Sequence, residues 1–360
     1  MSLRLTTAGE SHGPALVAIV TGLPAGLMLD REAIDADLAR RQEGYGRSPR
    51  QKLEQDRVEV LAGLRHGRTL GTPLALVVRN RDHANWEWGM SPWPPEGEAG
   101  GKGSKPVTLP RPGHADLAGA MKFGLADARD ALERASARQT AVAVAAGAVA
   151  KALLREIGVS VEGRVVSDDL EQRIDEARAE RDTVGGVVEV VAQGAPPGLG
   201  SYATKEERLD ARLAAALMGI QAVKGAEIGA GFELAERRGS AAHDEILVDE
   251  QGALHRETNF AGGIEGGVSN GEAVIVRAAM KPLPTLRRPL RSVDLESGEP
   301  GEALVERSDV AAVEALAVVA ESAVAFELAR AAREKFGGDS LEDFVGAWRA
   351  YVERIPWRTR

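Results

Sequence analysis

Clusters of apolar positions divide the chain into strand-like and helix-like segments. Short runs rich in Val and Leu predict strands at 74–78 (LALVV), 186–194 (GVVEVVAQG) and 272–280 (EAVIVRAAM). Longer segments predict helices over 31–42, behind the candidate N-cap Asp30, and over 136–157, 204–218, 309–335 and 340–353. Gly158 and the pair Gly337-Gly338 follow two of these helices, as glycine commonly does at a helix end.

The order of these elements predicts a mixed α/β chain without regular βαβ alternation. No GxGxxG stands between a strand and a helix, which disfavours a dinucleotide-binding fold. No fixed-period repeat is visible. Residues 84–106 contain three of the five Trp, four Pro and five Gly, and predict a long irregular loop. Such a loop is either a lid or oligomer contact, or a passive surface segment.

Composition then restricts the class of protein. The chain contains no Cys, which excludes disulfides, thiolate metal sites and a thiol nucleophile. No signal peptide and no run of about 18 apolar residues is visible, so we expect a cytoplasmic protein with no membrane segment. The net charge of −9 disfavours nucleic-acid binding. Basic clusters at 40–65 and 281–291 favour small anionic ligands, with solvated surface charge as the alternative.

Two histidines lie in glycine-containing turns. His12 is part of GESHG (9–13), where small neighbours allow close approach to a ligand. His114 is part of RPGHAD (111–116), where Asp116 either caps the following helix or orients the imidazole. Imidazole exchanges its proton near neutral pH, which suits both residues to catalysis. Either histidine could instead be structural.

Two arginine-containing segments are candidate anion sites. In RRQEGYGR (40–47), Arg41 and Arg47 could close on one phosphate or carboxylate, or Arg40 and Arg41 could merely complement a helix C-terminus. In ERASAR (133–138), small residues at the start of an Ala-rich helix would leave backbone N–H groups open to a phosphate. Ser136 could instead be a simple N-cap.

The C-terminal half adds four polar or glycine-dense segments, MGIQAVKG (218–225), NFAGGIEGG (259–267), KPLPT (281–285) and RSD (307–309). Asp309 is either a helix N-cap or a buried base. HExxH, P-loop and GxSxG motifs are absent, and the six histidines are far apart in the sequence, so no metal site is predicted. The residues alone therefore predict an anion-binding α/β enzyme that uses His and Arg.

Taken together, these segments resemble the chorismate synthase family. GESHG, RRQEGYGR, RPGHAD, ERASARQT (133–140), QAVKGAEIG (221–229), NFAGGIEGG, KPLPT and RSD occur in the family's order. The resemblance implies a fold of class α/β (α+β), a single-domain layered β-α-β sandwich over residues 1–360. Many relatives have His where Ser308 stands and Pro-Cys where Val310-Ala311 stands, a departure that leaves Arg307 and Asp309 unchanged.

The resemblance also implies an activity. The family converts 5-enolpyruvylshikimate 3-phosphate to chorismate, the last common step of the shikimate pathway and part of aromatic amino acid biosynthesis. Phosphate leaves C3 and a hydrogen leaves C6, with reduced FMN (FMNH2) required although there is no net redox change. By resemblance, His12 protonates or stabilises the leaving phosphate, His114 neutralises the flavin ring, and Asp309 relays the C6 proton near flavin N5.

The remaining site residues are carried over by motif. The flavin-binding set is Arg134, Ala135, Ser136, Gln221, Ala222, Gly266, Lys281, Pro282, Leu283, Pro284, Thr285 and Arg307. Arg41 and Arg47 match positions that the family assigns to NADP or to substrate anions. We expect the substrate, because no dinucleotide fingerprint is visible.

The resemblance further implies a cytoplasmic homotetramer that acts on a small molecule and receives reduced flavin from an external source. Two other functions remain open at this point. A flavin oxidoreductase on the same scaffold would need a net electron acceptor. A non-enzymatic anion-binding protein would bind FMN without turnover.

Overall fold

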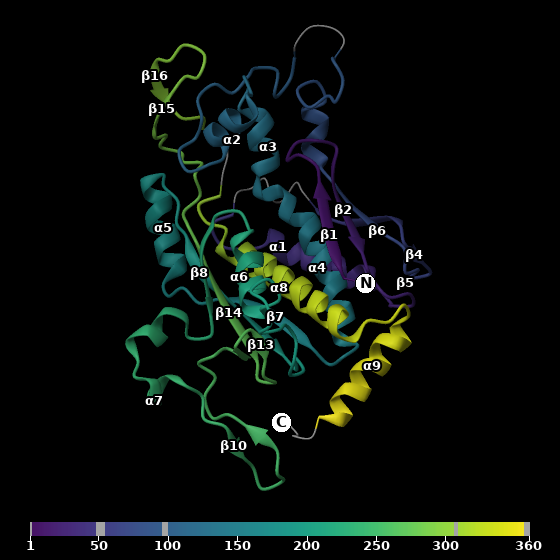
Figure 1. Ribbon diagram of the computed structural model, residues 1–360. Helices are drawn as coiled ribbons and strands as arrows, with labels where there is room; N and C mark the ends of the chain where they lie inside the picture. The colour runs from purple at the N-terminus through teal and green to yellow at the C-terminus, as the bar shows by residue number, and fades with distance from the viewer. Residues whose placement is uncertain (1, 48–54, 96–99, 306–308, 356–360) are drawn as a thin grey trace.

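The computed structural model describes residues 2–47, 55–95, 100–305 and 309–355. A four-stranded antiparallel sheet in the order β1-β2-β6-β3 forms one face of the molecule (Figure 1). Its strands are β1 (Arg4–Ala8), β2 (Ala15–Thr21), β6 (Leu74–Arg79) and β3 (Val58–Ala62). Side chains alternate between buried and partly buried along β2, as expected where one face of a sheet covers the core.

A second four-stranded antiparallel sheet has the order β7-β8-β14-β9. Its strands are β7 (Ser160–Val165), β8 (Gly186–Gln193), β14 (Val274–Met280) and β9 (Val223–Ile228). If the four long strands of each sheet are numbered in chain order, their order across both sheets is 1-2-4-3. In both halves a helix follows strand 2 and strand 4. The two halves therefore repeat one topology that the sequence does not show as a repeat.

Helices lie between the two sheets and complete three layers, β-α-β (Figure 1). They are α1 (Arg31–Gln42), α4 (Thr140–Arg155), α6 (Leu209–Met218) and α8 (Val313–Phe336). Helix α4 packs on β1, β2 and β6, whereas α8 packs on β7, β8 and β14. One hydrophobic core contains buried residues from both sheets and from these helices. The predicted α+β class and its layered arrangement are confirmed.

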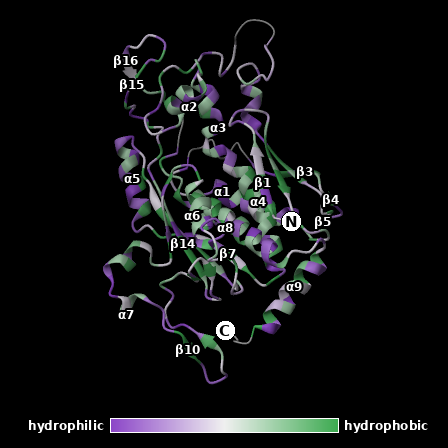
Figure 2. Cartoon of the chain, viewed as in Figure 1, coloured by the Kyte–Doolittle hydropathy of each residue, from purple (hydrophilic) through white to green (hydrophobic). Residues whose placement is uncertain are grey.

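Shorter elements surround these layers. The helices are α2 (Asp116–Phe123), α3 (Arg129–Ala135), α5 (Leu170–Glu180), α7 (Gly239–Ala242), α9 (Leu341–Arg354) and the 3-10 helices η2 (Arg81–Asn85), η3 (Ala137–Gln139) and η4 (Gly231–Glu236). The paired short strands are β4 (Leu64–Arg65) with β5 (Arg68–Thr69), β10 (Leu247–Val248) with β11 (Leu254–His255), β12 (Ile264–Glu265) with β13 (Val268–Ser269), and β15 (Arg291–Val293) with β16 (Pro300–Glu302). Figure 2 shows hydrophobic colour in the central helices and strands, and long hydrophilic stretches in outer segments such as α5.

All three predicted strands are confirmed as β6, β8 and β14. Helix α1 has its predicted bounds, and the Asp30 side chain caps it by accepting from the Glu32 backbone N–H. The last predicted helix is α9, which begins in a capping box at Ser340. Of the predicted loop at 84–106, residues 86–95 and 100–106 are irregular.

Three helix starts differ from prediction. The helix predicted from Ser136 begins with the 3-10 turn η3, which runs directly into α4 at Thr140. Ser136 is extended (φ −61°, ψ 142°) and its hydroxyl accepts from the Arg138 N–H, so its interpretation as an N-cap is confirmed. Arg134 and Ala135 end α3 and do not belong to this helix start. Helix α6 begins at Leu209, after a turn closed by Ser201 N–H to the Glu207 carbonyl. Helix α8 begins at Val313 behind Ala312, so the N-cap interpretation of Asp309 is wrong.

The region Arg129–Arg155, from α3 to α4, contains a window that is long and apolar enough to cross a membrane by length and composition alone. However, 72% of that window is buried inside the fold. Its apolar side chains are therefore accounted for by the packing of a core helix.

Candidate active site

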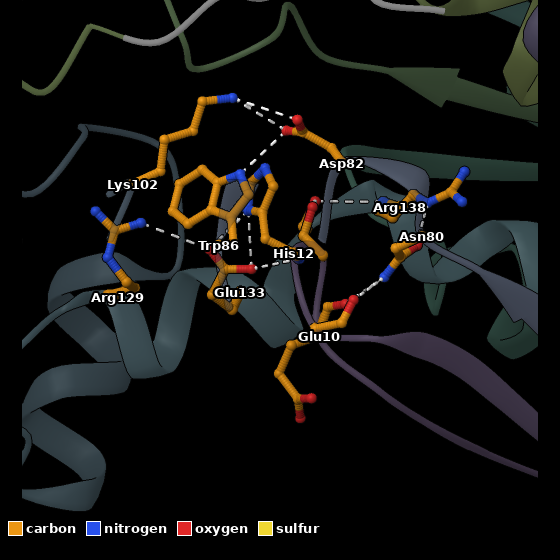
Figure 3. Close-up of polar contacts among 12 residues, drawn as sticks. Glu10, His12, Asn80, Asp82, Trp86, Lys102, Arg129, Glu133 and Arg138 are labelled. Carbon is orange, nitrogen blue, oxygen red and sulfur yellow. Dashed lines mark hydrogen bonds and ion pairs between the residues drawn. The ribbon is translucent and has the colours of Figure 1, made fainter. Parts of the chain in front are cut away.

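His12 lies in a tight loop between β1 and β2, held by contacts from distant segments (Figure 3). The loop requires glycine at Gly9, where φ is +111° and a Cβ would lie 2.5 Å from the Ala15 carbonyl oxygen. The imidazole is buried, its Nδ1 lies 2.8 Å from Glu133 Oε1, and it stacks on Trp86 with ring centroids 3.9 Å apart. Its Nε2 has no hydrogen-bond partner in the described part of the chain.

The segment 133–138 wraps around this loop. Arg134 donates to the carbonyls of Thr7 (2.9 Å) and Gly9 (3.2 Å), so its guanidinium fastens β1 to α3. The hydroxyl groups of Ser136 and Ser11 lie 3.2 Å apart. Two predicted segments far apart in sequence, GESHG and ERASAR, thus pack together and form one wall of the candidate active site.

Arg138 and Arg41 share one carboxylate behind that wall. Asp56 Oδ2 lies 2.7 Å from Arg138 Nη1 and 3.5 Å from Arg41 Nη1. Arg41 also donates to Thr140 Oγ1 and the Ala137 carbonyl. Burial lowers the pKa of Arg41 to about 9, against the opposing effect of Asp56, so the guanidinium stays charged at neutral pH. The side chains of Arg138, Arg41 and Asp56 together carry one net positive charge.

The predicted base and a predicted anion-binding residue form an ion pair with each other. Arg47 Nη1 lies 2.8 Å from Asp309 Oδ2, and both side chains are nearly buried. Val310 N–H donates to the Gly46 carbonyl and fixes the two segments together. Asp309 also lines a small pocket with Arg178, Arg181 and Arg287.

His114 belongs to a second cluster. Its Nδ1 lies 2.5 Å from Asp116 Oδ1, so Asp116 orients the imidazole, while helix α2 has no side-chain cap. Arg111 Nε donates to Asp116 at 2.9 Å, and Arg111 Nη1 donates to Thr285 Oγ1 at 3.0 Å. Burial raises the pKa of Asp116, but hydrogen bonds from His114 and Arg111 outweigh it and hold that pKa below its ordinary range.

The KPLPT segment adjoins this cluster. Lys281 Nζ donates to the Gly113 carbonyl, and its backbone N–H donates to the Ala222 carbonyl at 3.0 Å. Burial and, after it, the positive charge of Lys224 lower the pKa of Lys281. Ala222 has a left-handed backbone (φ +68°), which is uncommon for a residue with a Cβ. This region offers two neighbouring cations to an anionic ligand.

A continuous chain of contacts joins the two clusters. Thr183 Oγ1 donates to the Leu283 carbonyl at 2.8 Å, and Val184 N–H donates to the Val310 carbonyl at 3.0 Å. KPLPT thereby connects to the Arg47–Asp309 pair. Gly266 lies in the turn between β12 and β13, and no described contact joins it to these residues. Arg307 lies outside the described residues.

The residues that hold His12 were not predicted from the sequence. Glu133 is part of a predicted segment, but its role depends on a contact across 121 positions. Trp86 belongs to the predicted irregular loop, and its indole is buried and stacks on His12, so this part of the loop is not a passive surface segment. Arg129 and Glu133 are four residues apart on α3, a spacing that would have indicated an ion pair on one helix face.

Comparisons with known proteins decide the family. A chorismate synthase family model matches residues 3–169 and 164–332. The chain belongs to the chorismate synthase family. The chorismate synthase of Desulforudis audaxviator (strain MP104C) is 53% identical over 386 residues, covering 98% of each chain. That of Rubrobacter xylanophilus is 53% identical over 386 residues, covering 99% of this chain and 98% of the relative.

A solved structure supports the same assignment. A crystal structure of chorismate synthase has a TM-score of 0.77 to this fold at 36% identity, covering 99% of this chain and 98% of the other. The family resemblance inferred from the motifs is confirmed. The chain is a carbon–oxygen lyase of aromatic amino acid biosynthesis.

Proposed function

We propose that this enzyme eliminates phosphate from 5-enolpyruvylshikimate 3-phosphate to give chorismate, the last common step of the shikimate pathway. The C3–O bond breaks, phosphate leaves, and C6 loses a proton, so the reaction is a 1,4-elimination without net redox change. The observation that carries the proposal is the buried His12, whose Nε2 has no described partner, beside an excess of arginines.

The charge pattern supports this substrate class. The substrate carries one phosphate and two carboxylates, and such groups pair favourably with guanidinium groups. Arg41 and Arg138 both contact the carboxylate of Asp56, so this cluster brings together two guanidinium groups and one carboxylate. We assign Arg41 and Arg47 to substrate anions rather than to NADP.

His12 is the proposed acid toward the leaving group. A proton on its Nε2 passes to the departing phosphate oxygen, which stabilises the negative charge that forms as the C–O bond breaks. Trp86 covers one face of the ring and excludes water there. The proton lost from C6 balances the proton given to phosphate.

Asp309 is the proposed acceptor of the C6 proton. Its carboxylate is paired with Arg47, so the two proposed roles are coupled. An anionic substrate that draws Arg47 toward itself would break this ion pair and make the Asp309 oxygen that Arg47 contacts available for the proton from C6. Substrate binding would therefore prepare the base.

Reduced FMN is the proposed cofactor, and it would supply electron density to the C–O cleavage and then recover it. The residues fit an anionic cofactor, because Lys281 and Lys224 are neighbouring cations. His114 is proposed to neutralise the flavin ring, with Asp116 orienting its imidazole. The proposed flavin-binding set is Arg134, Ala135, Ser136, Gln221, Ala222, Gly266, the segment 281–285 and Arg307.

The remaining assignments are part of the same proposal. The chain would act as one domain, supported by the core shared between both sheets, and as a cytoplasmic homotetramer. Its reduced flavin would come from an external source. Size-exclusion chromatography with light scattering would test the homotetramer.

An anaerobic assay tests the reaction. Photoreduced FMN with 5-enolpyruvylshikimate 3-phosphate should give chorismate and phosphate in equal amounts, while the flavin is not consumed. His12→Ala and His114→Ala should each lower turnover by about 10²- to 10⁴-fold, with circular dichroism unchanged. Absence of turnover under strict reduction would reject the proposal, and NADPH consumption in proportion to product would indicate an oxidoreductase instead.

A further inference from the structure

We propose that Glu133 is the positioning residue for His12, fixing which imidazole nitrogen carries the exchangeable proton. The inference rests on the acid role of His12 proposed above. In this inference Glu133, Trp86 and Arg129 together hold the imidazole ring of His12 in place (Figure 3).

Glu133 contacts His12 through both carboxylate oxygens. Oε1 lies 2.8 Å from the imidazole Nδ1, and Oε2 accepts from the His12 backbone N–H at 2.9 Å. The Glu133 carbonyl also accepts from Ser11 N–H at 3.1 Å. The two backbone hydrogen bonds hold the backbone of Ser11 and His12, and the contact of Oε1 with Nδ1 fixes the orientation of the His12 imidazole.

The contact determines the tautomer. An ionised carboxylate can only accept, so the imidazole Nδ1 must carry a hydrogen. Neutral His12 therefore has its lone pair on Nε2, and protonated His12 has its exchangeable proton there. Nε2 is also the buried ring nitrogen that has no hydrogen-bond partner among the described residues. The proton that the reaction needs is thus carried by the nitrogen whose hydrogen bond the described residues leave unmade.

Trp86 and Arg129 also help to hold the His12 imidazole and the Glu133 carboxylate in place. Trp86 stacks on His12 at an interplanar angle of 19°, and its indole Nε1 donates to Asp82 at 3.0 Å, which limits rotation of both rings. Arg129 Nη1 lies 3.6 Å from Glu133 Oε1, so a cation favours the ionised carboxylate. The Glu133 side chain is only 1% exposed, so without such a cation its charge would be costly.

Substitutions separate the hydrogen bond from the charge. Glu133→Gln keeps an oxygen that accepts from Nδ1–H but removes the negative charge. Glu133→Ala removes both and leaves Nδ1 without its acceptor. We expect kcat to fall about tenfold in the first variant and about 100-fold or more in the second, with the KM for the phosphorylated substrate changed less than threefold.

The deciding measurement is ¹⁵N NMR of the imidazole in the full chain labelled with ¹⁵N-histidine and free of ligand. The His12 resonance is assigned by its loss in His12→Gln. At a pH at which the imidazole of His12 is neutral, we expect Nδ1–H with an unprotonated Nε2 in the wild-type protein and in Glu133→Gln, and a mixture of tautomers in Glu133→Ala. Asp130→Asn, a change to an exposed carboxylate on the same helix, is the matched control and should leave the spectrum unchanged.

Two results would overturn the inference. One is an Nε2–H tautomer at His12 in the wild-type protein, and the other is an unchanged His12 spectrum in Glu133→Ala. If Glu133→Ala does not fold, the inference is tested by the tautomer of His12 in the wild-type protein and by the fall in kcat expected for Glu133→Gln. The spectrum needs neither substrate nor flavin, so failure of the proposed reaction and failure of this inference are distinguishable.

Discussion

At the scale of single residues, the proposed catalytic groups are each held by an ionisable partner. Glu133 holds His12, Asp116 holds His114, and Arg47 holds Asp309. A buried group held in this way adopts one orientation and one protonation pattern, because the alternatives leave a charge unpaired. Local sequence identified His12, His114 and Asp309, but only Asp116 lies close enough in the chain to be predicted as a partner.

Arg47→Lys tests the role of the guanidinium fork. Lysine keeps the positive charge but loses the planar pair of donors that matches a carboxylate or phosphate. We expect the KM for the phosphorylated substrate to rise about tenfold or more, with a smaller change in kcat and an unchanged affinity for FMN. Steady-state kinetics and flavin fluorescence titration measure these quantities.

Arg31→Lys is the matched control, since the Arg31 side chain is 67% exposed and should tolerate the change. An unchanged substrate KM in Arg47→Lys would remove Arg47 from the substrate site. A weaker interaction with NADPH alone would instead support the dinucleotide assignment.

At the scale of elements, one carboxylate joins four of them. Glu321 on α8 accepts from Arg40 on α1 at 3.0 and 2.9 Å, from Lys151 on α4 at 2.5 Å, and from Gly163 N–H on β7 at 2.9 Å. Burial raises the pKa of Glu321, but these donors outweigh it and hold that pKa below the ordinary value. The sequence suggested that Arg40 lies beside an anion site or complements a helix C-terminus. In the structure its guanidinium links α1 to α8 through Glu321.

Glu321→Gln should lower the free energy of unfolding by about 1–3 kcal/mol at pH 7, because it removes the charge of a buried carboxylate that binds Arg40 and Lys151. The loss is limited because Arg40 is exposed and because both cations keep Asp37 as a partner. The folded-state pKa is depressed, so the contribution is complete above the unfolded value of about 4.3 and is lost as pH falls through the lower, folded value. The difference between the two proteins should thus be constant from about pH 6 to 8 and shrink below about pH 4.

Urea-induced unfolding across this pH range measures the effect. Glu206→Gln is the control, since the Glu206 side chain is 69% exposed and the change should cost less than about 0.5 kcal/mol. A Glu321→Gln protein as stable as this control would contradict the interpretation.

At the scale of the whole molecule, the two halves meet through closely packed helices. A Cβ built at Gly147 on α4 would lie 2.3 Å from Ser322 Cβ and 2.6 Å from Ser322 Cα on α8. Backbone cannot yield as a flexible side chain can, so the absence of a side chain at Gly147 allows α4 and α8 to approach. This contact sets the distance between the two sheets.

Gly147→Ala should therefore destabilise the protein by about 1–3 kcal/mol, although alanine favours a helix. Gly346→Ala on α9 is the matched control, because nothing lies within 4 Å of its Cβ position and alanine should stabilise the protein by up to about 1 kcal/mol. Thermal and urea unfolding of both variants give the comparison. Equal stability of the two would show that the helices are not in contact at Gly147.

The sequence by itself determined the segments that carry chemistry, the main strands and the C-terminal ends of the main helices. These depend on local causes: side-chain periodicity, caps, glycine turns, and motifs in a fixed order. It could not determine that Glu133 holds His12, that Asp309 pairs with Arg47, or that Glu321 joins α1, α4 and β7. Each of these contacts links residues more than 100 positions apart, and only tertiary packing decides which charges become buried together.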